Sequence, residues 1–194
     1  METEFEAKFY PINKKLIRSK LKKIGAKLVQ PETLTRIIVF NSKFNPAINC
    51  HYVRVRDEGN CITMSVKINA KENEKLTDQK EIKVKVDDFD KTVEILERLS
   101  LHRSGNQEKL RETWQIDNVE IVIDTWPELE TYIEIEAPSE ELAKKTAEKL
   151  GLDWGERIIT SVIEIFMKKY SQTADEVLKK FENLTFGNSS QNIK

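Results

Sequence analysis

The sequence predicts an α+β protein built on a closed, eight-stranded antiparallel β-barrel with flanking helices. About eight segments alternate apolar and polar residues with a period of two, and several follow one another without an intervening helix. Some are separated by only a few turn residues, such as Asp117-Asn118. Consecutive strands with short turns favour antiparallel pairing over repeated βαβ units. The polar positions of these segments carry formal charges, which a closed sheet would gather inside a barrel.

The expected strands are recognised by alternation or by β-branched and aromatic residues. In residues 52–57, Arg54 and Arg56 alternate with valines. Residues 33–41 are instead rich in Thr, Ile, Val and Phe, which favour extended structure. The complete set of expected strands covers residues 4–10, 33–41, 52–57, 61–68, 81–86, 109–116, 119–124 and 132–136.

Three of the five expected helices are marked by capping residues at their starts, and two of these also by a glycine at the end. Apolar residues three or four positions apart give each helix one face that can pack on the sheet. The expected helices run from Asn13 to Gly25, from Asp88 or Asp90 past Leu99, from Ser139 to Gly151, roughly over residues 156–170, and around Val177 and Phe181.

The length and charge of the chain restrict its class. Its 194 residues suit one domain, expected over residues 1–182, with a polar and disordered tail over residues 183–194. With 32 Lys and Arg against 33 Asp and Glu, the net charge of −1 gives no global attraction to nucleic acid or to an anionic membrane. An acidic N-terminus without an apolar run, and no apolar stretch long enough to span a bilayer, predict a cytoplasmic protein.

The charged residues on the polar faces of the strands have both signs. Lys and Arg suit phosphate oxygens, while carboxylates suit Mg²⁺ or Mn²⁺, so a site with both suits a metal-bridged triphosphate. A nucleic-acid groove would instead combine basic and aromatic residues with few carboxylates. The alternative is a solvated sheet face whose charges serve solubility. The basic members are Lys8, Arg54, Arg56, Lys67, Lys83, Lys109 and Arg111, and the acidic members are Glu4, Glu6, Glu81, Asp124, Glu134 and Glu136.

The order of these motifs resembles the CYTH superfamily, the triphosphate tunnel metalloenzymes. The resemblance begins with an E-x-E-x-K motif close to the N-terminus and covers roughly residues 1–170. Each motif alone is weak, but each lies on a period-two strand and the order is that of the family. The matched residues are Glu4, Glu6 and Lys8, then Arg54 and Arg56, Lys67, Glu81, Lys109 and Arg111, Asp124, and Glu134 with Glu136.

The resemblance implies a role for each matched residue inside an eight-stranded tunnel. It implies phosphate binding by Lys8, Arg54, Arg56, Lys67, Lys109 and Arg111, and Lys83 is expected to join them only because it belongs to the same set of basic residues on the strands. It implies that Mg²⁺ or Mn²⁺ is bound by Glu4, Glu6, Asp124, Glu134 and Glu136, and that Glu81, Lys67 and Arg111 act in catalysis. Lys83 departs from the family, because many members have an acidic residue there. A C-terminal lysine used by some members matches only by region, at Lys168 or Lys169.

The expected function is hydrolysis of a phosphoanhydride bond in inorganic triphosphate or a nucleoside triphosphate. The expected partner is a triphosphate-containing small molecule, without nucleic acid or membrane, and homodimerisation stays open. A second possibility is a class IV adenylyl cyclase, in which the 3′-hydroxyl of ATP attacks the α-phosphorus and pyrophosphate leaves. A third, of another class, is a module that binds polyphosphate or nucleotide without turnover.

Overall fold

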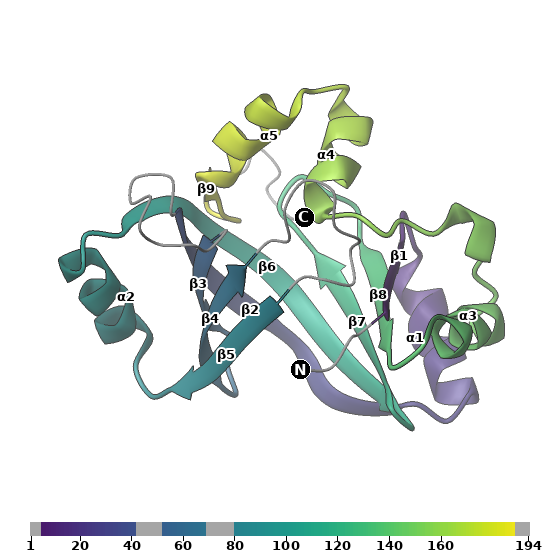
Figure 1. Cartoon of the computed structure of the whole chain (residues 1–194). Helices are drawn as coiled ribbons and strands as arrows, with labels where there is room; N and C mark the ends of the chain where they lie inside the picture. The colour runs from purple at the N-terminus through teal and green to yellow at the C-terminus, as the bar shows by residue number, and fades with distance from the viewer. Residues whose placement is uncertain (1–4, 42–51, 69–79, 189–194) are drawn as a thin grey trace. The chain divides into compact units, whose positions relative to one another are not determined.

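The computed structural model of the chain describes residues 5–41, 52–68 and 80–188 (Figure 1). No helix in these ranges is long and apolar enough to cross a bilayer. The described elements are β1 (Phe5–Phe9), α1 (Lys14–Lys23), β2 (Lys27–Asn41), β3 (Tyr52–Asp57), β4 (Ile62–Ile68), β5 (Lys80–Val86), α2 (Phe89–Arg98), β6 (His102–Ile116), β7 (Val119–Thr125), β8 (Tyr132–Ala137), α3 (Glu140–Lys149), a 3₁₀ turn (Trp154–Glu156), α4 (Val162–Tyr170), α5 (Ala174–Phe181) and β9 (Asn183–Leu184).

The strands form one sheet with the hydrogen-bonded order β1-β8-β7-β6-β2-β3-β4-β5, and β9 pairs in parallel with β6 off this path. The order is not closed by hydrogen bonds between strands of the described residues. At the β1 end, the main chain of Lys8 exchanges two hydrogen bonds with Ile158, of 2.9 and 2.8 Å. The antiparallel sheet with flanking helices is therefore confirmed, whereas closure into a barrel is not.

The chain divides into two compact units, which are described separately. Unit 1 comprises Met1, Leu34–Glu108 and Leu178–Lys194, and unit 2 comprises Glu2–Thr33 and Lys109–Val177. The strands β2 and β6, each of 15 residues, contribute to both units.

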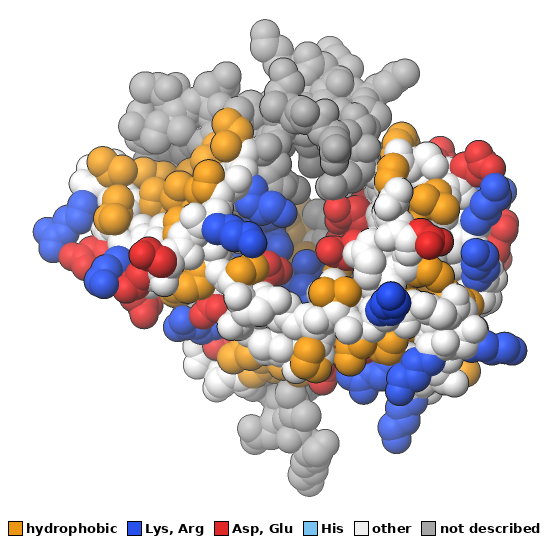
Figure 2. Space-filling model, turned by 90° about the horizontal axis from the view of Figure 1, so that it is seen from below, with side chains coloured by type: hydrophobic (Ala, Val, Ile, Leu, Met, Phe, Trp, Pro, Cys, Tyr) orange, Lys and Arg blue, Asp and Glu red, His pale blue; other side chains and the backbone are white. Residues whose placement is uncertain are grey.

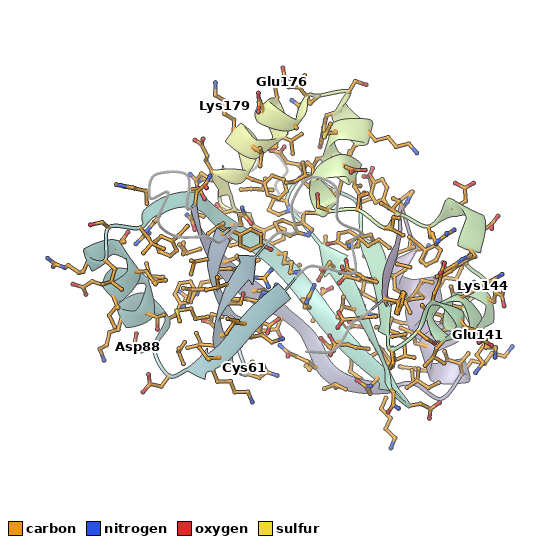
Figure 3. All side chains as sticks on the ribbon, viewed as in Figure 1. Cys61, Asp88, Glu141, Lys144, Glu176 and Lys179 are labelled. Carbon is orange, nitrogen blue, oxygen red and sulfur yellow. The ribbon has the colours of Figure 1, made fainter. Side chains whose placement is uncertain are left out.

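In unit 1, α2 covers one face of the sheet. Phe40 of β2 and Val55 of β3 have no exposed surface, and they belong to one core cluster with Phe89 and Val93 of α2. Asp88 lies at the start of α2 (Figure 3). Its carboxylate accepts a hydrogen bond from the Lys91 amide at 2.9 Å. Because side chains alternate along a strand, packing α2 on this face leaves the charged positions of β3 on the other.

In unit 2, α1 and α3 contribute to one core with β1, β7 and β8. Ile121, Ile123, Ile133 and Ile135 from β7 and β8 are completely buried in this cluster. Leu21 of α1 and Ala147 of α3 lie in the same cluster, also without exposed surface. The charged residues of the same strands therefore occupy the opposite face.

The predicted caps of two helices are confirmed. The side chain of Asn13 accepts from the Leu16 amide at 3.0 Å, and that of Ser139 accepts from the Leu142 amide at 3.3 Å. The expected helix over residues 156–170 is wrong in its first part, because α4 begins only at Val162. The preceding segment is held extended, since Ile158 pairs with the main chain of β1.

Candidate functional site

Four strands of unit 2 carry most of their charged residues on the same face. Residues directly opposite each other in an antiparallel pair point to the same side of the sheet. Glu6 of β1 lies opposite Glu136 of β8, which lies opposite Glu120 of β7. One step along, Lys8 lies opposite Glu134. We call the residues Glu6, Lys8, Lys109, Arg111, Glu120, Asp124, Tyr132, Glu134 and Glu136 the unit 2 polar face.

Lys8 is an almost completely buried cation between two carboxylates of this face. Only 6% of the residue is exposed. Its Nζ pairs with Glu6 Oε1 and lies 3.6 Å from Glu134 Oε2. A buried ammonium is costly unless a counter-charge accompanies it, so the two glutamates account for the tolerance of a lysine here.

Asp124 of β7 is the centre of a second buried cluster. Its Oδ1 accepts from Arg111 Nε at 2.8 Å. Its Oδ2 accepts from Lys109 Nζ at 2.8 Å, from Arg111 Nη2 at 2.7 Å and from the Tyr132 hydroxyl at 3.2 Å. The Tyr132 oxygen in turn accepts from Trp126 Nε1 at 3.0 Å, and Lys109 Nζ lies 5.5 Å from the centroid of the Trp126 ring. One carboxylate thus fixes two cations of the expected phosphate-binding set.

The electrostatics of this cluster keep Asp124 ionised. Burial acts to raise the pKa of Asp124, but Arg111 and Lys109 outweigh it and hold the pKa well below its usual range. Burial alone would lower the pKa of Arg111, yet the charge of Asp124 raises it well above the ordinary value. Burial, together with the Asp124 charge, raises the pKa of Tyr132, so its hydroxyl remains a neutral donor at physiological pH.

In unit 1, the face opposite α2 is predominantly basic. Arg54 of β3 lies opposite Ser65 of β4, which lies opposite Lys83 of β5. Arg56 is aligned in the same way with Lys85, through Thr63. We call Arg54, Arg56, Lys83 and Lys85 the unit 1 basic face.

Two arginines of the unit 1 basic face are oriented by neighbours. The guanidinium of Arg54 lies 5.9 Å from the ring centroid of Tyr52, and Arg56 Nη1 lies 3.3 Å from Glu58 Oε1. Lys83 and Lys85 are exposed. Acidic and basic side chains both appear on the face of the molecule in Figure 2, as the balanced composition predicts.

Three predicted site residues cannot be assessed through their side chains. Glu4 lies outside the described residues. Lys67 and Glu81 lie opposite each other on β4 and β5, but their side chains fall outside the described part of the chain. Their predicted roles therefore stay predictions.

Sequence reasoning missed several residues of these two faces. Glu120 and Tyr132 have the same strand parity as Asp124 and Glu134, so alternation alone would have identified them. Lys85 is found by the same rule in β5. Trp126 follows the end of β7, where no periodic signal exists.

The apolar face of β6 also carries a charge that was not predicted. Glu112 is 3% exposed, and its carboxylate accepts from Arg18 Nε at 2.9 Å and from Trp114 Nε1 at 2.6 Å. Trp114 itself lies in the core. This ion pair joins α1 to the sheet on the side away from the unit 2 polar face.

The loop after β7 is held by α4. Lys169 donates to the main-chain oxygen of Glu128 at 2.9 Å and to Glu130 Oε2 at 2.8 Å. The hydroxyl of Tyr10 also donates to Glu130, and that of Tyr170 donates to the Glu128 oxygen. Of the two lysines matched by region, Lys169 thus fastens a loop, and Lys168 is exposed.

The carboxylates of unit 2 fit a hard divalent cation in type and in backbone position. Glu6, Glu136 and Glu120 form a row across three strands, an arrangement in which like charges oppose each other unless a cation intervenes. The described residues contain no group of three or more His, Cys, Asp or Glu placed to hold a metal ion. The oxygens of Asp124 are directed instead to Lys109, Arg111 and Tyr132.

Comparison with known proteins gives one family. The family model of the CYTH domain matches residues 2–182. No curated protein matches the chain.

Solved structures with a similar fold come from distant organisms. A conserved hypothetical protein from Pyrococcus furiosus is 21% identical with a TM-score of 0.66, over 83% of this chain and 98% of that one. A "putative adenylate cyclase" from Vibrio parahaemolyticus is 14% identical with a TM-score of 0.70, over 85% and 98%. A "putative adenylyl cyclase" from Hippeastrum, described as having a dominant triphosphatase activity, is 11% identical with a TM-score of 0.57, over 89% and 97%. At these identities the likeness establishes the fold.

Proposed function

Because this chain belongs to the CYTH domain family, we propose that it is a divalent-metal-dependent enzyme that hydrolyses a phosphoanhydride bond of a triphosphate. The observation that carries the proposal is the pairing of two cations, the buried Lys109 and the partly buried Arg111, with one buried carboxylate in a face that also holds Lys8 and a row of glutamates. Side chains that suit phosphate and side chains that suit a hard cation therefore share a single face.

The proposed roles follow the chemistry of each group. Lys8, Lys109 and Arg111 bind phosphate oxygens, and Arg111 neutralises charge that develops at the reacting phosphorus. On the unit 1 basic face, Arg54 and Arg56 offer guanidinium forks for the same kind of ligand, and Lys83 an ammonium. Glu4, Glu6, Glu134 and Glu136 bind Mg²⁺ or Mn²⁺, which would polarise the phosphoanhydride. Glu81 orients the attacking water, and Lys67 contacts the phosphate.

Asp124 is proposed to position cations rather than to bind metal. Both of its oxygens accept hydrogen bonds from Arg111, and one also accepts from Lys109. Its carboxylate fixes where these two donors point, and preorganised donors are the largest single source of transition-state stabilisation in many enzymes.

A second candidate is synthesis of cyclic AMP from ATP. It is favoured by similarity in fold to the Vibrio parahaemolyticus protein, whose name gives that activity. The Hippeastrum protein, described as having a dominant triphosphatase activity, supports hydrolysis as the first choice. A binding module without turnover is the remaining alternative.

The test is a product analysis with Mg²⁺ or Mn²⁺ and a panel of inorganic triphosphate, ATP and other nucleoside triphosphates. We expect phosphate from at least one substrate, and loss of turnover in EDTA. Cyclic AMP with pyrophosphate would instead identify the cyclase, and binding without any product the non-catalytic module.

Two pairs of variants separate the proposed metal and phosphate roles. Glu6→Gln and Glu136→Gln keep the side-chain shape but remove a negative charge, so turnover should fall at least about 100-fold while triphosphate still binds. Arg54→Ala and Arg56→Ala should weaken triphosphate binding itself. Full turnover in both Gln variants would refute the metal assignment, and unchanged binding in both Ala variants would refute the phosphate assignment.

A further inference from the structure

Tyr132 has a polar role that its residue type does not suggest. It is the first residue of β8, two positions before Glu134, so its side chain lies on the unit 2 polar face rather than in the isoleucine core. The residue is only 2% exposed. A buried phenol needs a partner for its hydroxyl, and here the hydroxyl has two.

These two hydrogen bonds link an indole to a carboxylate through one oxygen. Trp126 Nε1 donates to the Tyr132 oxygen at 3.0 Å, and the Tyr132 hydroxyl donates to Asp124 Oδ2 at 3.2 Å. Among the described donors to Asp124, Tyr132 is the neutral one, since Lys109 and Arg111 are cations. The direction of the relay is fixed, because an indole can only donate and an ionised carboxylate can only accept.

The same indole also lies beside the ammonium of Lys109. Lys109 Nζ is 2.8 Å from Asp124 Oδ2 and 5.5 Å from the Trp126 ring centroid. The ammonium is thus held from two sides, by the carboxylate that Tyr132 contacts and by the ring whose N–H is bound to Tyr132. A change at the Tyr132 hydroxyl reaches Lys109 by both routes.

We propose that Tyr132, supported by Trp126, is a positioning residue that sets the orientation of Lys109 and Arg111 for triphosphate through the carboxylate of Asp124. This proposal rests on the proposed function for its ligand, but the hydrogen-bond relay itself does not depend on any ligand. The hydroxyl fixes the rotation of the carboxylate, so Oδ1 stays with Arg111 Nε while Oδ2 stays with Lys109 and Arg111 Nη2. Removal of the Tyr132 hydroxyl leaves Lys109 and Arg111 in place but loosens the Asp124 carboxylate that orients them.

The first test measures binding of inorganic triphosphate in EDTA by calorimetry, where turnover does not interfere. Tyr132→Phe should raise the dissociation constant about tenfold, equivalent to roughly 1.4 kcal/mol. The matched control is Tyr170→Phe, which removes a hydroxyl of the same unit that donates to the main chain of Glu128. The control should stay within about twofold of the wild type. Equal effects of the two variants would overturn the proposal.

The second test asks whether the effect passes through Asp124. If Tyr132 acts by that route, Tyr132→Phe should change the dissociation constant little when introduced into Asp124→Asn, because coupled residues are not additive. The same fold-change in both backgrounds would overturn the proposal. If Asp124→Asn does not fold, Trp126→Phe replaces it, and it should weaken binding in the same direction as Tyr132→Phe by removing the indole donor.

A third measurement needs no triphosphate. The exchange rate of the Arg111 Nε–H with solvent, observed by nitrogen NMR, should increase in Tyr132→Phe and not in Tyr170→Phe. An unchanged Arg111 signal would refute the positioning role whatever the ligand is. If the wild type binds no triphosphate but Tyr132→Phe still speeds the exchange of the Arg111 Nε–H, the proposed function is refuted and the hydrogen-bond relay is established.

Discussion

Glu130 shows how a single exposed carboxylate connects distant parts of unit 2. It accepts from Lys169 of α4 at 2.8 Å and from the hydroxyl of Tyr10, next to β1. These hydrogen bonds, of which the one from Lys169 has the largest effect, lower the pKa of Glu130 from 4.5 to about 2. Because the pKa is lower in the folded chain, ionised Glu130 stabilises the fold above about pH 4.5, and this stabilisation is lost as the pH falls towards 2.

Replacing Glu130 by Gln should therefore lower stability only at higher pH. Since the side chain is 55% exposed, solvent screening limits the difference in unfolding free energy to about 1 kcal/mol or less. Urea unfolding of wild type and Glu130→Gln at several pH values should give curves that separate near neutrality and converge near pH 2. Lys169→Met removes the same ion pair, so its difference from wild type should also shrink towards pH 2, leaving only the part due to the hydrogen bond to the Glu128 oxygen. A difference that stays constant with pH would contradict the assignment.

The face of the sheet on which a side chain lies was predictable where alternation along the strand was regular. Lys8 and Glu134, far apart in sequence, lie opposite each other on one face, as their parity predicted. Tyr132 was not recognised, because an aromatic residue within a strand is most simply assigned to a core. Glu112 was missed for the converse reason, since it is an acid on the apolar side of β6, and its ion-pair partner Arg18 is 94 residues away in the sequence.

At the scale of elements, helix starts depend on local chemistry, which permits a matched test. The Ser139 hydroxyl accepts from the Leu142 amide at the start of α3, whereas Ser161 at the start of α4 makes no side-chain capping bond. Ser139→Ala should lower the unfolding free energy by about 1 kcal/mol, and Ser161→Ala by clearly less. Denaturant unfolding would measure both losses of unfolding free energy, provided that the dependence of this free energy on denaturant concentration is the same in the variants and the wild type. Equal losses would show that the Ser139 bond contributes nothing.

Element lengths were less predictable than element starts. The strands β2 and β6 both extend N-terminally beyond the expected segments, to Lys27 and His102. Residues 102–108 are mostly polar and do not alternate with apolar residues, so nothing local marks them as a strand. Asn106 and Gln107 pair with β9, which comes more than 70 residues later. Pairing over such distances leaves no periodic trace in the sequence.

At the scale of the whole molecule, the order of strands is what the sequence could least determine. Alternation defines the two faces of each strand, but closure depends on whether the first and last strands of the order pair. Lys8 hydrogen-bonds Ile158 instead, a partner in a segment that was predicted to be helical. The antiparallel α+β class followed from short turns, whereas the pairing at the β1 edge depended on one non-local contact.

The concentration of charge predicts that a polyanion will stabilise the folded chain. Arg54 lies in line with Lys83, and Arg56 with Lys85, across β3, β4 and β5, so like charges share one face and a bound anion would reduce their repulsion. Inorganic triphosphate at about 100 times its dissociation constant should add roughly 2.7 kcal/mol by mass action. For a chain of this size, that corresponds to a rise of about 5–10 °C in the melting temperature.

Thermal unfolding is measured in EDTA and again with Mg²⁺, and sodium chloride of equal ionic strength replaces triphosphate in the control. Arg54→Ala should show a smaller rise than wild type at the same triphosphate concentration. A melting temperature that triphosphate leaves unchanged, with and without metal, would rule out these cations as its binding site.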